Sequence, residues 1–111
     1  MEQRLPTHLE VSGLVRAVQA EGGFATVLSK GERDAGTLAI VTLERDEPAK
    51  FYERMPMMDG SRSFTLTREQ DLEKPAEFDG YLAKRGHQDP DLWIVELDIA
   101  GAARFVALQH K

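Results

Sequence analysis

The segment with the clearest potential for binding chemistry is a polar loop at residues 30–36, KGERDAG. Its two glycines allow positive backbone φ angles, and Asp34 can hydrogen-bond the backbone near it. Exposed N–H groups in such loops form concave anion sites, and two cationic side chains would add positive charge. The sequence therefore predicts an anion site whose candidate ligand-binding residues are Lys30, Gly31, Arg33, Asp34 and Gly36.

The spacing of the two loop glycines resembles that of a phosphate-binding P-loop, but the chemistry differs. A P-loop places a lysine after its second glycine and then begins a helix, whose N-terminus holds the phosphate. Here Thr37 follows Gly36, and the apolar residues after it indicate a strand. The simpler interpretation is a hairpin loop between two strands.

A second cluster, formed by His87, Asp89 and Asp91, offers an imidazole and two carboxylates on one short segment. These groups can bind transition metals or hard cations, but three ligands on one loop make a poor site without others. Asp89 before Pro90 is also typical of a turn. We therefore expect no metal site and no cofactor.

The residues of the chain do not form a recognisable catalytic constellation. There is no cysteine, which excludes thiolate catalysis, thiolate zinc sites and disulfides. No serine lies in a nucleophile elbow, and the histidines at positions 8, 87 and 110 are far apart in the sequence. The sequence therefore favours a protein that is not an enzyme.

The composition is that of one small acidic domain. The chain has 111 residues and a net charge of −5, with its acidic excess in residues 69–98, which opposes nucleic-acid binding. There is no apolar run near the roughly 20 residues of a membrane span, and residues 1–10 lack a signal-peptide core. We expect a cytoplasmic single domain over residues 1–111, with residues 1–6 frayed and no membrane segment.

Two segments have the pattern of helices. Within residues 8–21, apolar residues from Val11 to Val18 lie at spacings of three and four, and the preceding Thr7 and Glu10 have capping-box spacing. An alternative is a short strand at 9–11 with the helix beginning near Ser12. A second helix is predicted from Pro75 to Gly86, since proline favours the first helical position and glycine the end.

Five segments predict strands: residues 24–29, 37–43, 50–55, 62–67 and 92–98. The unbroken apolar run in 37–43 indicates a central strand. Glu53 shares a face with Phe51 and Met55, which indicates that residues 50–55 form an edge or short strand. Trp93 is the expected core anchor, and residues 103–107 fit either a sixth short strand or a final helical turn.

The order helix, four strands, helix, then one or two strands indicates an α+β fold, written α-β-β-β-β-α-β(-β). Short connections between the first four strands suggest an antiparallel meander. We therefore expect a mostly antiparallel sheet of five or six strands, with two helices packed on one face.

Residues 11–41, VSGLVRAVQAEGGFATVLSKGERDAGTLAIV, and 89–97, DPDLWIVEL, resemble a family of short bacterial proteins classified as domain of unknown function 1491. The resemblance extends over nearly the whole chain. It is carried by Gly23-Phe24-Ala25, Lys30-Gly31, Asp34-Ala35-Gly36 and residues 89–93. None of these is a catalytic signature, so the resemblance implies a stand-alone bacterial protein and assigns no functional residue.

Our leading functional hypothesis is a small non-enzymatic protein that acts by association, as a homodimer or with an unknown protein partner. It is motivated by the small size, by the absence of catalytic motifs, and by Met57 and Met58 in a polar loop. The alternative is a small-molecule (anion) binding protein or enzyme that uses residues 30–36.

Overall fold

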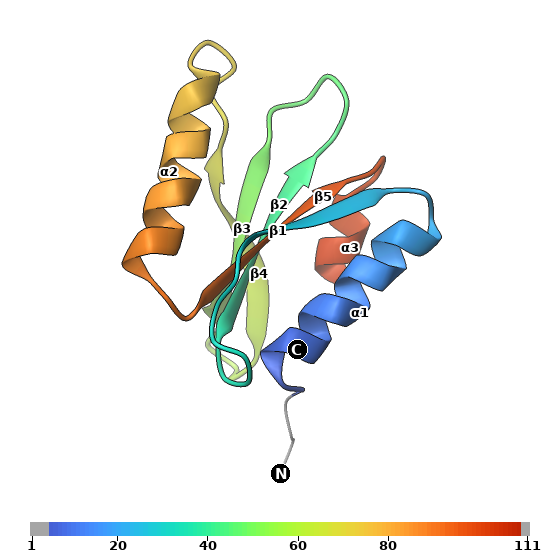
Figure 1. The fold of residues 1–111 in the computed structure, drawn as a ribbon, viewed down its shortest axis with the longest axis vertical. Coiled ribbons are helices and arrows are strands. Elements are labelled where there is room, and N and C mark those ends of the chain that lie inside the picture. Colours follow the sequence, from blue (N-terminus) through green and yellow to red (C-terminus); the bar gives the residue numbers. More distant parts are fainter. Residues whose placement is uncertain (1–4, 110–111) are drawn as a thin grey trace.

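A five-stranded sheet forms the middle layer of the structure, a computed structural model that describes residues 5–109 (Figure 1). The strand order is β1-β5-β2-β3-β4; β5 runs parallel to β2, and every other neighbouring pair is antiparallel. The fold is α+β with a mostly antiparallel sheet, as predicted. In chain order the elements are α1 (Thr7–Ala20), β1 (Phe24–Ser29), β2 (Thr37–Leu43), β3 (Lys50–Pro56), β4 (Arg62–Glu69), α2 (Pro75–Gln88), β5 (Leu92–Asp98) and α3 (Ala103–Ala107).

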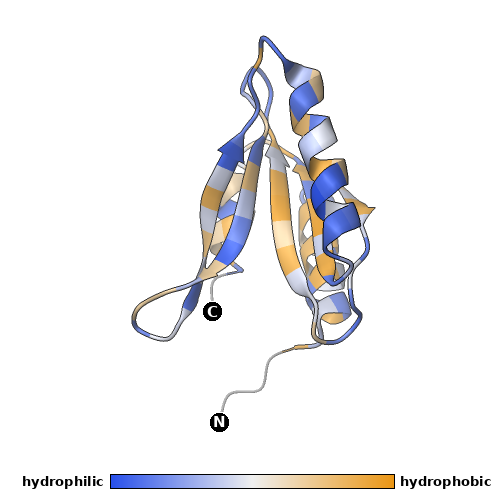
Figure 2. Ribbon diagram, turned by 90° about the vertical axis from the view of Figure 1, so that its left-hand side faces the viewer, coloured by the Kyte–Doolittle hydropathy of each residue, from blue (hydrophilic) through white to orange (hydrophobic). Residues whose placement is uncertain are grey.

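The predicted meander is wrong at its start, because β5 lies between β1 and β2. The two strands that flank the polar loop are therefore not a hairpin. Burial explains the insertion: five of seven residues are buried in each of β2 and β5, and none of six in β1. Two strands that are apolar on both faces stabilise the fold most at the centre of the sheet, and hydrophobic residues dominate there (Figure 2).

Strand β3 is not an edge strand, because it pairs with β2 on one side and β4 on the other. The edges are β1 and β4. The charge that suggested an edge, Glu53, is accommodated inside the sheet because it pairs with Arg85 of α2 at 2.6 Å.

The helices cover both faces of the sheet, which corrects the prediction that they share one. α1 and α3 pack with Trp93, Val95 and Leu97 on one face, while α2 packs with Leu92 and Ile94 on the other. Each face of the central strands is apolar, so each needs its own cover. Trp93 is 4% exposed and lies in the first of these cores, as predicted.

Helix α1 begins at Thr7, so the alternative of a strand at residues 9–11 is wrong. The capping box is also absent. The Thr7 hydroxyl donates to the carbonyl oxygens of Asp34 and Gly36, the latter at 2.8 Å, and Glu10 pairs with Arg54. Long-range partners thus take the two side chains that would have capped the helix.

The remaining boundaries differ less from the predictions. Helix α2 begins at Pro75 but continues past Gly86 to Gln88. Residues 103–107 form α3, the helical option, and not a sixth strand. Leu5 and Pro6 precede α1, while the rest of the predicted frayed segment, residues 1–4, lies outside the described residues. None of the helices within residues 5–109 has the length and apolar character needed to cross a membrane.

Candidate functional site

The loop between β1 and β2 packs directly on the start of β5. A Cβ atom built on Gly31 or Gly36 would lie 2.4 or 2.5 Å from the carbonyl oxygen of Asp91. That oxygen also accepts hydrogen bonds from the backbone N–H groups of Glu32 and Thr37. The two glycines are therefore needed for close approach between two backbones, and neither has a positive φ.

The carboxylate of Glu32 binds two backbone N–H groups of its own loop. Glu32 accepts hydrogen bonds from the N–H groups of Asp34, at 2.9 Å, and Ala35. The carbonyl oxygen of Glu32 accepts the indole N–H of Trp93 at 2.7 Å. Those two N–H groups already have a partner, so an anion at this loop would meet the side chains of Lys30 and Arg33.

Lys30 and Arg33 line a groove that runs between α1, β1 and the loop, with a volume of about 650 Å³. Helix α1 contributes residues that lie one, three or four positions apart. They therefore form a band along one side of the helix, next to the side chains that pack into the core. Val27 contributes from β1 and Trp93 from β5. The full lining consists of His8, Val11, Ser12, Val15, Arg16, Gln19, Val27, Lys30, Arg33 and Trp93.

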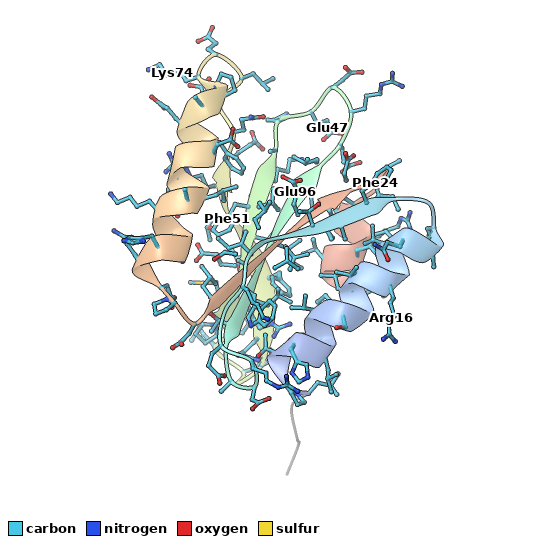
Figure 3. The ribbon with its side chains drawn as sticks, in the orientation of Figure 1. Arg16, Phe24, Glu47, Phe51, Lys74 and Glu96 are labelled. Carbon is cyan, nitrogen blue, oxygen red and sulfur yellow. The ribbon has the colours of Figure 1, made fainter. Side chains whose placement is uncertain are left out.

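The charge of this groove contrasts with that of the whole chain. Three cationic side chains and one imidazole line it without any carboxylate, although the net charge of the protein is −5. Within residues 5–109, Arg16 and Lys30 have no ion-pair partner, whereas Arg33 lies 3.8 Å from Asp34. Arg16 extends from α1 into solvent, at the rim of the groove (Figure 3).

Of the residues predicted from the sequence, the groove therefore brings together Lys30 and Arg33. Gly31, Asp34 and Gly36 shape the loop behind it and do not line the groove. The groove residues on α1 were not identified from the sequence. A signal for them exists, because polar residues beside the apolar face of an amphipathic helix can be recognised from their spacing. The position of Val27 opposite that stripe depends on how α1 packs against β1, which no local pattern shows.

A second hollow of about 370 Å³ lies on the α2 side of β1, and its charge is opposite. Leu28 and Ser29 form its β1 wall, and Asp79, His87 and Glu96 add polar groups. Partial burial, together with the nearby Asp98 and Asp79, raises the pKa of Glu96 above its usual value. The two hollows beside β1 thus have opposite electrostatic character.

Of the cluster considered from the sequence, His87 lies in the last turn of α2, while Asp89 and Asp91 lie between α2 and β5. Asp89 accepts a hydrogen bond from the N–H of Asp91 at 3.2 Å, as the turn interpretation predicted. Within residues 5–109, there is no group of three or more His, Asp or Glu side chains arranged to hold a metal ion.

Exposed apolar side chains gather on β1 and at the tip of the β3–β4 hairpin. On β1, Phe24 is 73% exposed, and Val27 and Leu28 are also exposed. At the tip of the β3–β4 hairpin, Met57 and Met58 project into solvent. That tip is held by the hydrogen bond from the Met57 N–H to the Ser61 carbonyl at 2.8 Å.

Comparison with known proteins places the chain among structurally characterised bacterial relatives. A family model described as "Protein of unknown function (DUF1491)" matches residues 5–107. The crystal structure of a DUF1491 family protein from Caulobacter crescentus CB15 is 28% identical, with a TM-score of 0.78, over 92% of this chain and 94% of that chain. The solution structure of protein Atu0922 from A. tumefaciens is 29% identical, with a TM-score of 0.71, over 98% of both chains. No match was found among curated proteins.

Proposed function

Because the chain belongs to the DUF1491 family, whose function is unknown, we propose a function from the groove itself: the protein binds a small organic anion there. The observation that carries this proposal is the concentration of Arg16, Lys30 and Arg33 around one groove in an acidic protein. We place this activity in the bacterial cytoplasm, as the sequence leads us to expect.

The composition of the groove defines the ligand's chemistry. A pair of exposed opposite charges contributes roughly 0.2–1 kcal/mol, so the cations alone would hold an inorganic anion only weakly. The walls also present Val15, Val27 and Trp93. An apolar body on the ligand adds about 25 cal/mol for each Å² that it buries. The groove therefore fits a carboxylate, sulfonate or phosphate ester attached to an aliphatic or aromatic body.

The size of the groove agrees with this assignment. Small-molecule sites have volumes of roughly 300–1,000 Å³ and combine apolar walls with a few polar groups that fix the ligand's orientation. A groove of about 650 Å³ lies within that range. Ser12 and Gln19 on α1 supply uncharged hydrogen-bonding groups beside the cations.

The test uses anilinonaphthalene sulfonate, an aromatic sulfonate whose fluorescence rises in apolar sites. We expect saturable binding that octanoate displaces and inorganic phosphate does not. The double substitution Arg16→Gln and Lys30→Gln should weaken binding roughly tenfold, because it removes two favourable charge contacts. The matched control, Arg45→Gln with Lys84→Gln, removes the same charge from exposed residues outside the groove and should leave binding unchanged.

Equal affinities in the two double variants would show that the dye binds elsewhere, and would end the proposal. Because this dye also binds partly unfolded proteins, each variant must first show the wild-type unfolding temperature. Native mass spectrometry of untagged protein from a bacterial host adds an independent readout. A small bound mass that the groove double variant loses would identify the natural ligand.

A second candidate function is association with a protein partner, most simply as a homodimer. The exposed methionines of the β3–β4 hairpin support it, because methionine side chains adapt to varied apolar surfaces. The test is to measure the molar mass of the protein in solution at increasing protein concentrations. If the hairpin tip binds the partner, replacing Met57 and Met58 by serine should abolish that binding.

A further inference from the structure

Strand β1 is a sheet edge with little of the usual protection. It pairs with β5 on one side, and within residues 5–109 no strand or helix pairs with its other side. Its six residues, FATVLS, include no charged residue and no proline. The opposite edge, β4, carries Arg62, Arg68 and Glu69.

This asymmetry matters because a free edge offers unpaired N–H and C=O groups to any other strand. Natural proteins block such edges with charges, prolines, bulges or covering segments. The irregularity in β1 lies between Val27 and Ser29, where its register with β5 shifts, and residues 24–27 stay regular. The exposed Phe24 increases the tendency of this edge to pair (Figure 3).

We propose that a second copy of this chain pairs antiparallel with β1, joining two five-stranded sheets into one continuous sheet. Antiparallel pairing of identical strands is self-complementary about a two-fold axis. Since β1 has no charge, no like charges meet within the pair. This proposal goes beyond anion binding and does not depend on it.

The charges that flank β1 favour the same arrangement. Glu21 precedes the strand and Lys30 follows it directly. In an antiparallel pair the beginning of one strand lies beside the end of the other, so Glu21 of one copy approaches Lys30 of the other. Opposite charges therefore meet at both ends of the interface. Glu21 is exposed and forms a 2.6 Å contact with Arg104 through one carboxylate oxygen.

Side chains on one face of β1 gain partners in this pair. Ala25 packs against the core on the α1 side, so Phe24 and Thr26 point to the α2 side, where Leu28 lines the second hollow. Across the two-fold axis Phe24 of each copy comes near Leu28 of the other, so two exposed apolar side chains of each copy become covered.

The pairing also brings the two candidate sites together. A two-fold axis perpendicular to the continuous sheet puts α1 of both copies on the same face. Each groove is bordered by Val27 of β1, so the two cationic grooves become neighbours across the interface.

The test compares matched threonine-to-lysine substitutions on the two sheet edges, using sedimentation analysis over a range of protein concentrations. Thr26 on β1 and Thr65 on β4 are both exposed. We expect wild-type protein and Thr65→Lys to dimerise alike. We expect Thr26→Lys to dissociate roughly tenfold or more readily, because it places two like charges at the pair.

A second pair, Phe24→Asp on β1 against Leu66→Asp on β4, guards against misfolding of one variant, since both native side chains are exposed. A wild-type protein that stays monomeric at all concentrations would overturn the proposal. So would β1 variants that dimerise as well as the β4 variants. The dye-binding measurement is independent, so failure of the interface and failure of the groove give different results.

Discussion

The indole nitrogen of Trp93 donates a 2.7 Å hydrogen bond to the backbone carbonyl of Glu32, which precedes it by 61 residues. This bond attaches the loop between β1 and β2 to the central strand β5. Trp93 also lines the groove with Lys30 and Arg33. The residue that anchors the core therefore also positions the cationic wall of the candidate site.

We predict that Trp93→Ala lowers the free energy of unfolding by roughly 3–5 kcal/mol, the usual cost of emptying a large aromatic site. Trp93→Phe keeps most of the packing but leaves the Glu32 carbonyl without its donor, and should cost about 1–3 kcal/mol. Urea denaturation measures both. An unchanged midpoint for Trp93→Ala would mean that the indole is not packed in the core.

Alanine at Gly31 should destabilise the protein by roughly 1–3 kcal/mol, because its Cβ would collide with the backbone of Asp91. Gly13, in α1, is the matched control. A Cβ there meets no atom within 4 Å, so Gly13→Ala should stabilise the protein by up to about 1 kcal/mol through helix propensity. Thermal unfolding of the two variants should therefore shift in opposite directions.

The ion pair between Arg54 and Glu10 joins β3 to α1, and its side chains are only 4% and 9% exposed. Arg54 also stacks on Phe64, with its guanidinium carbon 4.7 Å from the ring centre. Glu10→Gln leaves a buried guanidinium without its counter-charge, so we expect a loss of roughly 3–5 kcal/mol.

Glu21→Gln is the matched control for that change, because its pair with Arg104 is about half exposed. Its expected cost is under about 1 kcal/mol. Equal unfolding midpoints for the two glutamine variants in guanidinium chloride would show that the Arg54 pair is effectively solvated.

Two glutamates on the α2 side of the sheet should respond to pH in opposite ways. The hydrogen bond from Arg85 is the main cause that holds the pKa of Glu53 below its usual value, and one from Thr67 adds to it. The unfolded state then binds more protons, so Glu53 contributes stability above about pH 4.3, and this is lost as pH falls through the folded-state pKa. Glu53→Gln should therefore destabilise the protein at pH 7 and have little effect in acid.

Glu96 has the opposite linkage, because burial is the main cause that raises its pKa. The native state binds more protons between the ordinary pKa and the raised one, so stability falls as pH rises through that interval. Glu96→Gln should stabilise the protein at pH 7, with the gain fading in acid. Unfolding temperatures of both variants from pH 3 to 7, a range that spans the ordinary glutamate pKa, provide the measurement. A destabilised Glu96→Gln at pH 7 would contradict this.

Local patterns predicted the secondary structure closely. The limits of β1, β2 and β5 agree with the predicted segments, and α1 differs by one residue at each end. Strand alternation and helical stripes depend on neighbouring residues, so they are readable from the chain. The same alternation accounts for the faces of β5, where Trp93 lies on one side and Ile94 on the other.

Strand order and helix placement were not predictable in this way. The insertion of β5 between β1 and β2 depends on which strands bury most surface when all compete for the centre. Glu53 looked like an edge residue because its partner, Arg85, lies 32 residues away in the sequence. Of the candidate site, Lys30 and Arg33 were identified from the loop, while His8 and Val27 were not.

The order of residues was enough to assign the helices and strands, the α+β class and the family resemblance, because periodicity and the positions of proline and glycine act over a few residues. The packing of the whole chain, in contrast, makes β1 an edge strand and brings α1 and the loop together around a cationic groove. Those features arise from contacts between distant segments, where the burial of whole strands outweighs any local preference.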